Sequence, residues 1–195
     1  MYDRRVTTIV SANVGSYDRP ATHVAQSVPV DYVTVTDNPG GGEPRRVAKG
    51  PKLRPWLWAP DGGPWIWLDA AFDVVSPAFV ADMLELVGSQ PVAMFEHPFR
   101  DCLYDEADAV GARHQANHYR MLGVPAGLGL WAAGVIVYTT PCEYLANVWA
   151  AELAAWCLRD QVSLPVVLER VGVRPVTIPG NIFDNDWLTW RHHLT

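Results

Sequence analysis

The stretch GGPWIWLDAAFDVVSP, residues 62–77, decides the fold because it places an apolar β-type run directly before a carboxylate. Its segment PWIWLDA, residues 64–70, has the length and the aromatic and branched residues of a buried strand. An unpaired carboxylate in an apolar strand costs several kcal/mol, so Asp69 should be paired, solvated or bound to a cation. The sequence thus predicts a central strand that ends in a site.

Other short β-type runs alternate with helical patterns along the chain. They cover residues 6–13, 31–37, 90–96, 133–139 and, less clearly, 174–179. This alternation favours an α/β fold. A length of 195 residues is that of one domain, so we expect residues 1–195 to form a single unit.

Helix signals lie between these runs. Ser76 can cap a helix that opens with Pro77, and TPCE at 140–143 combines a capping box with proline at the first helical position. After it, apolar residues recur at helical spacing and predict one buried face: Leu145, Val148, Trp149, Leu153 and Trp156. The Gly- and Pro-rich segment from Pro39 to Pro64 is expected to be a long loop with at most one helical turn.

Composition excludes several classes of protein. Residues are 49% hydrophobic, no apolar run is long enough to span a membrane, and the N-terminal residues lack a signal-peptide pattern. We therefore expect a soluble, cytoplasmic protein with no membrane contact. Three cysteines without a CxxC pair predict buried free thiols.

The net charge of −6 gives the chain no general attraction to nucleic acid. The segment RRVAKGPKLR nevertheless carries five basic residues, which could hold phosphates locally: Arg45, Arg46, Lys49, Lys52 and Arg54.

In an open α/β sheet, ligands bind at the carboxyl ends of the strands, so the residues after each run are candidates for a site. Polar and acidic groups are frequent there: Asn13, Gly15, Tyr17 and Asp18 after the first run, Asp37 and Asn38 after the second, Asp69 after the third, and Glu96 and His97 after the fourth.

Six motifs in order resemble a known family across almost the whole chain. They are VSANVGSYD, VDYVTVTDNP, a lysine before WIWLDAAFDV, then EHPFRDCLYDEA, YRMLGVPAGLGL and RDQVS. Together they look like the glycosyltransferase-like domain of plant Golgi proteins and bacterial sugar-polymer loci. The resemblance implies a GT-A-like, Rossmann-type mixed sheet flanked by helices that binds a nucleotide-sugar.

The resemblance also implies that Asp69 holds Mn²⁺ or Mg²⁺, which would bridge the diphosphate of the donor. The motif reads Asp69-Ala70-Ala71, so the second carboxylate of a DxD motif is missing. Asp73 would lie on the same side as Asp69 if the strand continues. His192 or its neighbour could supply a further ligand, or the ion could keep a water-rich shell.

For the donor, the family reading assigns Asn13, Gly15, Tyr17 and Asp37 to the base and ribose, whereas plain turns would have the same composition. Lys52, with Arg54, would neutralise the diphosphate. The alternative for Lys52 is a solvated loop cation.

His97 and Arg100 are expected to contact donor phosphate, sugar or acceptor, and Gln161 to bind the donor. Asp160 is the candidate general base or the residue that orients the acceptor hydroxyl, although it could also be a helix cap. The acids Asp105 and Glu106 also suit a helix N-terminus.

The sequence therefore predicts a metal-dependent glycosyltransferase that moves a sugar from a nucleoside diphosphate, most simply a UDP-sugar, to a hydroxyl. The acceptor could be a glycan, a small molecule or a hydroxylated base in DNA. Two alternatives remain open: a degenerate nucleotide-sugar-binding module, and a metal-dependent phosphohydrolase. The donor sugar, the stereochemistry and the oligomeric state are left open.

Overall fold

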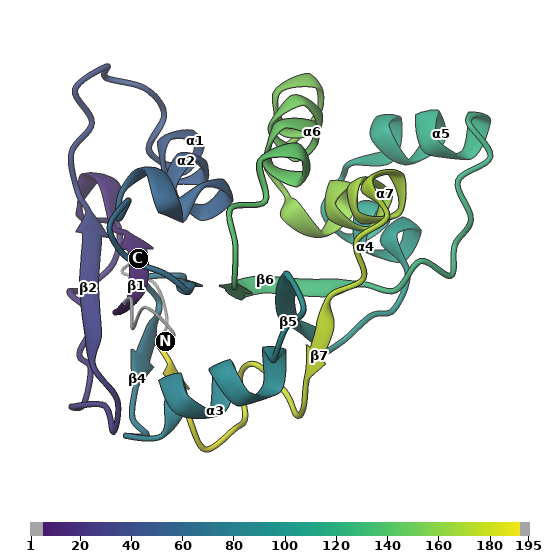
Figure 1. The fold of residues 1–195 in the computed structure, drawn as a ribbon. Helices are drawn as coiled ribbons and strands as arrows, with labels where there is room; N and C mark the ends of the chain where they lie inside the picture. The colour runs from purple at the N-terminus through teal and green to yellow at the C-terminus, as the bar shows by residue number, and fades with distance from the viewer. Residues whose placement is uncertain (1–5, 192–195) are drawn as a thin grey trace.

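A computed structural model describes residues 6–191, which form one compact α/β unit around a mixed sheet (Figure 1). The sheet has six strands in the order β2-β1-β3-β6-β5-β7. Their bounds are β1 (Thr7–Ala12), β2 (Val30–Val35), β3 (Trp65–Leu68), β5 (Val92–Glu96), β6 (Trp131–Tyr138) and β7 (Val176–Ile178). β6 runs antiparallel to both of its neighbours, and the other pairs are parallel.

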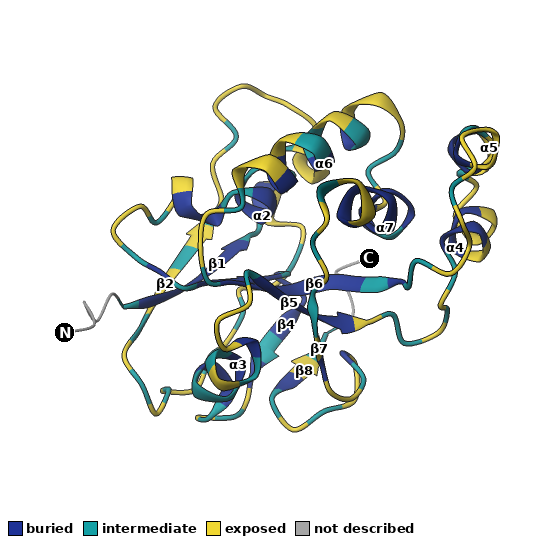
Figure 2. Ribbon diagram, turned by 45° about the vertical axis from the view of Figure 1, so that its right-hand side comes forward, coloured by how far each residue is buried: buried dark blue, intermediate teal, exposed yellow. Residues whose placement is uncertain are grey.

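Helices cover both faces of this sheet (Figure 2). On one side α3 (Phe79–Val87) packs with a small second sheet of β4 (Phe72–Val74) and β8 (Leu188–Trp190). The other side carries α2 (Lys49–Leu53), α6 (Glu143–Ala155) and α7 (Asp160–Val171). Beside α7 lie α4 (Leu103–Ala109) and α5 (Arg113–Met121).

The strand β3 is central because both of its faces are buried. Ile66 and Leu68 pack toward α3, whereas Trp65 and Trp67 pack toward α2, α6 and α7. A strand covered by helices on both faces needs an unbroken apolar run, which is what the sequence WIWL provides. The run ends where the sheet edge meets the site, at Asp69.

All six predicted strands are confirmed, with ends that differ by at most two residues. The sequence reading missed β4 and β8, because three-residue strands are too short to show a pattern. The helix at 160–171 begins where RDQVS predicts it.

The prediction of a long loop from Pro39 to Pro64 was wrong. The segment holds α1 (Pro44–Val47), α2 and a 3₁₀ turn, η2 (Pro55–Leu57). Glu43 caps α1 by accepting from the backbone N–H groups of Arg45 and Arg46, and Pro44 occupies the first turn. Local capping therefore outweighs the Gly and Pro content of this segment.

Two helix starts also differ from the prediction. The hydroxyl of Ser76 accepts from the N–H of Ala78, so it caps the turn that leads into α3, which begins at Phe79. The helix α6 begins at Glu143 rather than after Thr140, because the Glu143 carboxylate accepts from the indole of Trp56 instead of completing a capping box.

Two smaller expectations were wrong in degree. Trp156 ends the predicted apolar stripe of α6 but is exposed, whereas Leu145, Trp149 and Leu153 are buried. The three cysteines are free thiols, as predicted, but they are half-buried. None of the helices within residues 6–191 has the length and apolar character needed to cross a membrane.

Candidate functional site

A cavity of about 400 Å³ opens at the carboxyl ends of β1, β3 and β5. Ala12, Asp69 and His97 line it from these three strand ends. This is the edge at which open α/β sheets bind ligands, and the volume is that of a small-molecule site. Eight of the residues predicted at strand ends or as site residues line the cavity: Tyr17, Asp18, Lys52, Asp69, His97, Arg100, Asp160 and Gln161.

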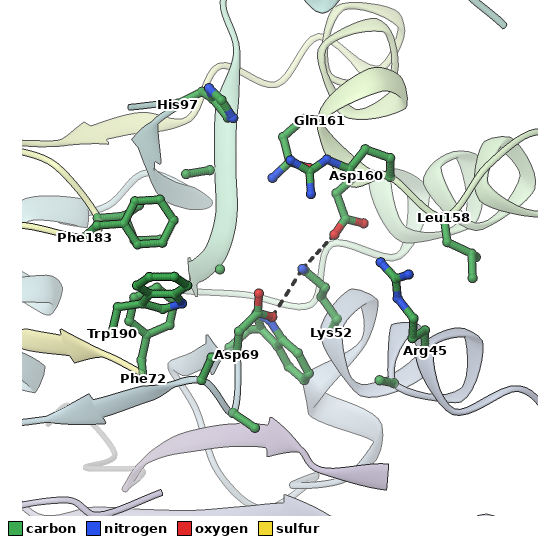
Figure 3. Close-up of a pocket in the computed structure, with 18 of the residues that line it drawn as sticks. Arg45, Lys52, Asp69, Phe72, His97, Leu158, Asp160, Gln161, Phe183 and Trp190 are labelled. Atoms are coloured by element: carbon green, nitrogen blue, oxygen red, sulfur yellow. Dashed lines mark hydrogen bonds and ion pairs between the residues drawn. The ribbon is translucent and has the colours of Figure 1, made fainter. Parts of the chain in front are cut away.

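Two contrasting walls face each other across the cavity, with Asp69 between them (Figure 3). We call one the basic wall; it consists of Arg45, Lys49, Lys52, Arg100 and Arg159 around Asp160. The other, the aromatic wall, consists of Phe72, Phe99, Phe183 and Trp190. Five basic side chains face three lining carboxylates, so an acidic chain gathers positive charge at this cavity.

Asp160 is the centre of the basic wall. Its Oδ2 accepts from the ammonium groups of Lys49 at 2.6 Å and Lys52 at 2.7 Å. Burial would raise the pKa of Asp160, but the two lysines outweigh burial and lower it to about 2. Asp160 is therefore a buried anion that fixes two cations at the wall.

This environment bears on the predicted role of Asp160 as a general base. A base works best when its pKa lies near the working pH, and a carboxylate with a pKa of about 2 holds a proton weakly at neutral pH. Nor does the carboxylate cap its own helix, since its Oδ2 bonds to lysines from α2. Its geometry favours a positioning role.

Asp69 lies at the base of the cavity, immediately after β3. Its Oδ1 accepts from the indole N–H of Trp67 at 2.7 Å and from Lys52 at 3.4 Å. Its Oδ2 faces Gly134 of β6, where an added Cβ would lie 3.4 Å from it. The sequence predicted that Asp69 is paired, solvated or bound to a cation, and in the structure it is paired with a lysine and an indole.

The sequence left two alternatives for Lys52, a diphosphate contact or a solvated loop cation, and the structure excludes the second. Only 4% of Lys52 is exposed. Burial opposes its charge, but Asp160 and Asp69 outweigh burial and raise the pKa of Lys52, so the ammonium stays protonated. It also lies over the ring of Trp67, with Nζ 5.7 Å from the centroid.

Glu106 holds the two arginines of the basic wall that follow β5 and precede α7, Arg100 and Arg159. This fully buried carboxylate accepts from Arg100 at 2.8 Å and from Arg159 at 2.7 Å. Each arginine donates one hydrogen bond to Glu106 and keeps further N–H groups for the cavity, which both arginines line. Glu106 is more than a helix-dipole partner, since it fixes two guanidinium groups.

His97 shapes the loop after β5. Its Nδ1 accepts from the backbone N–H of Arg100 at 3.1 Å, and its Nε2 lies 3.8 Å from Glu106. Burial lowers the pKa of His97 despite the opposing effect of Glu106, so the ring is neutral at pH 7. With Nδ1 engaged, the ring positions Arg100 and the loop.

We expect Glu106→Gln to lower the free energy of unfolding by about 2–3 kcal/mol, the scale of hydrogen bonds to charged groups. The neutral amide accepts more weakly from Arg100 and Arg159, which the carboxylate holds in the wild type. Urea denaturation followed by tryptophan fluorescence measures the effect. Glu85→Gln, an exposed glutamate on α3, is the matched control. Equal stability of the two variants would contradict the role assigned to Glu106.

The aromatic wall is built around Phe183, which comes from the loop between β7 and β8. Phe72 and Phe99 stack on it with centroids at 6.1 and 6.0 Å, and Trp190 meets it edge-on at 5.1 Å. Phe99 is 72% exposed and Phe183 40% exposed. Large exposed rings at a cavity mouth leave apolar area for a ligand to cover.

Four predicted donor-binding residues do not line the cavity. The Asn13 side chain bonds to both the N–H and the C=O of Asp18, and Gly15 has φ 73°, so both shape the loop that presents Tyr17. Asp37 is exposed beyond the end of the edge strand β2. Arg54 turns to α6, where it bonds to Asn147 at 2.7 Å.

Asp73 is also apart from Asp69, because the strand does not continue through residues 69–71. A turn follows β3, and Asp73 lies on β4 in the second sheet. Its carboxylate accepts from the N–H of Thr22 at 2.6 Å and pairs with Arg191 at 3.1 Å. His192 lies outside the described residues.

The described side chains at the cavity do not form a site in which protein groups alone coordinate a divalent ion. In residues 6–191, no three Asp, Glu, His or Cys side chains converge as metal ligands. Asp69 Oδ1 and Asp160 Oδ2 already accept from lysine or indole donors, and Asp73 is engaged elsewhere. A buried ammonium at Lys52 occupies the position beside Asp69.

Other lining residues had no specific role assigned from the sequence. Arg45 and Lys49 were named only as part of a basic segment that could hold phosphates; with Lys52 they follow helical spacing, which would have placed all three on one face had a helix been predicted there. Glu106 and Arg159 appeared within quoted motifs but were not chosen. Phe183 and Gly134 gave no signal, since their role depends on contacts between distant segments.

Comparison with known proteins assigns no family: no protein-family model matches the chain, and no curated protein matches it. The resemblance to the glycosyltransferase-like domain rests on the short motifs alone.

Proposed function

We propose that this protein is a glycosyltransferase that moves a sugar from a nucleoside-diphosphate sugar to a hydroxyl acceptor, with UDP-sugars the first donors to test. The observation that carries the proposal is the opposition of a basic and an aromatic wall across Asp69 at the end of a central strand. The GT-A-like fold belongs to the same proposal. The mixed sheet and the acidic end of β3 support it.

The basic wall suits the diphosphate. In the transfer, the bond between the sugar C1 and the phosphate oxygen breaks, and its electron pair leaves with the nucleoside diphosphate. A bond forms between C1 and the acceptor oxygen, and the acceptor hydroxyl releases its proton to solvent. Ammonium and guanidinium groups aimed at that oxygen stabilise the developing charge. Guanidinium groups also match phosphate oxygens in geometry. Asp160 contributes by holding Lys49 and Lys52 in place.

The aromatic wall suits the sugar rings. One face of a pyranose carries mostly C–H groups, which pack against exposed rings such as Phe99 and Phe183. The open Oδ2 of Asp69 lies between the walls and can accept from a hydroxyl of the sugar or the acceptor. In this arrangement C1 lies between the leaving diphosphate and the acceptor oxygen.

A DNA acceptor gains little support from the basic segment. Arg45, Lys49 and Lys52 line the cavity, and Arg54 turns to α6. Arg46 alone of the five basic side chains lies outside both arrangements. The segment thus serves the cavity, and a glycan or small molecule is the preferred acceptor.

The test is a thermal-shift panel of UDP-, GDP-, CMP- and TDP-sugars, followed by detection of the released nucleotide. Ligand binding to the native state raises Tm by mass action, so no acceptor need be known. We expect one nucleoside class to raise Tm and to release its nucleoside diphosphate on incubation. A Tm shift without turnover, even with acceptor sugars added, would favour the binding module. No shift with any donor would refute the proposal.

Phe99→Ala tests the aromatic wall. We expect nucleotide release from the donor to slow by about 3- to 10-fold, the equivalent of one aromatic contact, while affinity for the nucleoside diphosphate stays the same. Stability should change little because Phe99 is so exposed. Tyr144→Ala is the matched control, since Tyr144 is 68% exposed on α6 and lies outside the cavity. Equal rates for the two variants would remove the sugar from this wall.

A further inference from the structure

We propose that the basic wall, and not a divalent cation, neutralises the diphosphate of the bound nucleotide. The proposal rests on the proposed function, since it concerns how the same ligand is held. It reverses the expectation that the sequence gives for Asp69.

The cation beside Asp69 is the ammonium group of Lys52. The ammonium of Lys52 lies 3.4 Å from Asp69 Oδ1 and 2.7 Å from Asp160 Oδ2. A metal ion bound to Asp69 would meet this positive charge at close range. An ammonium has three donors, so Lys52 keeps one N–H beyond the two carboxylates. Lys52 thus supplies a fixed cation where the family resemblance implies a metal.

The carboxylates of Asp69 and Asp160 already accept hydrogen bonds from protein donors. Asp69 Oδ1 accepts from Trp67 as well as Lys52, and Asp160 Oδ2 accepts from two lysines. A hard divalent ion needs several oxygen ligands, and here each carboxylate has one oxygen already committed to protein donors. These contacts orient lysines, which is the arrangement expected of an anion site.

The basic wall has free N–H groups that can donate to an anion. In the part of the chain that the structure describes, the guanidinium of Arg45 makes no hydrogen bond or ion pair, yet it lines the cavity. Arg100 and Arg159 each bond to Glu106 through one nitrogen. Three guanidinium groups therefore keep free N–H groups at a cavity that also contains Lys49 and Lys52.

Asp69→Asn separates the two accounts. If Asp69 binds a metal that carries the diphosphate, the variant should lose binding. If Lys52 does this work, the amide oxygen still accepts from Trp67 and Lys52 while a negative charge leaves the cavity. Binding should then tighten, by about threefold or more. Asp69 has a 40% exposed side chain, so the variant should fold.

The experiment is calorimetric titration of inorganic pyrophosphate into the whole protein, once in EDTA and once with Mn²⁺. We expect binding in EDTA, tighter binding by Asp69→Asn, and at least tenfold weaker binding by Lys49→Met. Lys49 is partly exposed, and its loss leaves Asp160 paired with Lys52. Arg46→Met, outside the cavity, is the matched control and should differ from wild type by less than twofold, within about 0.4 kcal/mol.

Failure of the metal-free inference and failure of the glycosyltransferase proposal give different results. Binding of pyrophosphate and nucleotide-sugars only with Mn²⁺, and its loss in Asp69→Asn, would overturn the metal-free inference and leave the glycosyltransferase proposal standing. Binding of pyrophosphate in EDTA without binding of any nucleotide-sugar would support an anion site and refute the transferase. No binding of pyrophosphate under either condition would overturn the inference outright.

Discussion

Asp160→Asn should lower the free energy of unfolding at pH 7 by about 3–5 kcal/mol, because it leaves the ammonium of Lys49 without its anion and the buried ammonium of Lys52 with only Asp69, at 3.4 Å. The substitution keeps the shape of the side chain, so the loss reports charge. Urea denaturation followed by tryptophan fluorescence measures it. Asp101→Asn, an exposed aspartate in the loop before α4, should behave as wild type. A stability equal to wild type would show that Asp160 does not hold the basic wall.

The pH dependence of the same variant gives a second readout. The folded-state pKa of Asp160 is lowered from 3.8 to about 2, so its contribution is fully present above about pH 4. The contribution is lost as pH falls from there through about 2. Wild type should therefore lose its advantage over Asp160→Asn in this acidic window. A difference that stays constant to pH 2 would contradict the assigned cause.

Lys52→Met should weaken the binding of the nucleoside diphosphate by about 10- to 150-fold, which corresponds to the loss of one charge-assisted hydrogen bond of about 1.5–3 kcal/mol. Each carboxylate keeps a donor, since Asp160 retains Lys49 and Asp69 retains Trp67. Circular dichroism should confirm the fold, and calorimetry measures the affinity. Arg46→Met again serves as the control. Unchanged affinity in a folded Lys52→Met would remove Lys52 from the diphosphate site.

The sheet could be predicted from the sequence because its strands are long or strongly apolar. The run WIWL, buried on both faces, indicated the centre of the sheet, and the carboxylate after it indicated the site. Short elements could not be predicted in this way. β4 and β8 pair with each other across more than a hundred residues, so neither shows its pairing locally.

The site was predictable in its members more than in its connections. Asp69, Lys52 and Asp160 were chosen from three separate motifs, and the fold brings them into one network. Their partnership determines their chemistry. Asp160 reads as a base in isolation, whereas two lysines from α2 lower its pKa to about 2. Asp73 shows the converse, since a turn after β3 sends it to Arg191.

The measurement that most directly tests the central claim is calorimetric titration of a nucleoside, its diphosphate and its diphosphate-sugar into the wild-type protein. The uridine series comes first, and the guanosine, cytidine and thymidine series follow. The account predicts that in one series the diphosphate and the diphosphate-sugar bind at least about 100-fold more tightly than the nucleoside, since the basic wall supplies several charge-assisted bonds. Equal affinity of nucleoside and diphosphate-sugar, or no binding in any series, would contradict it.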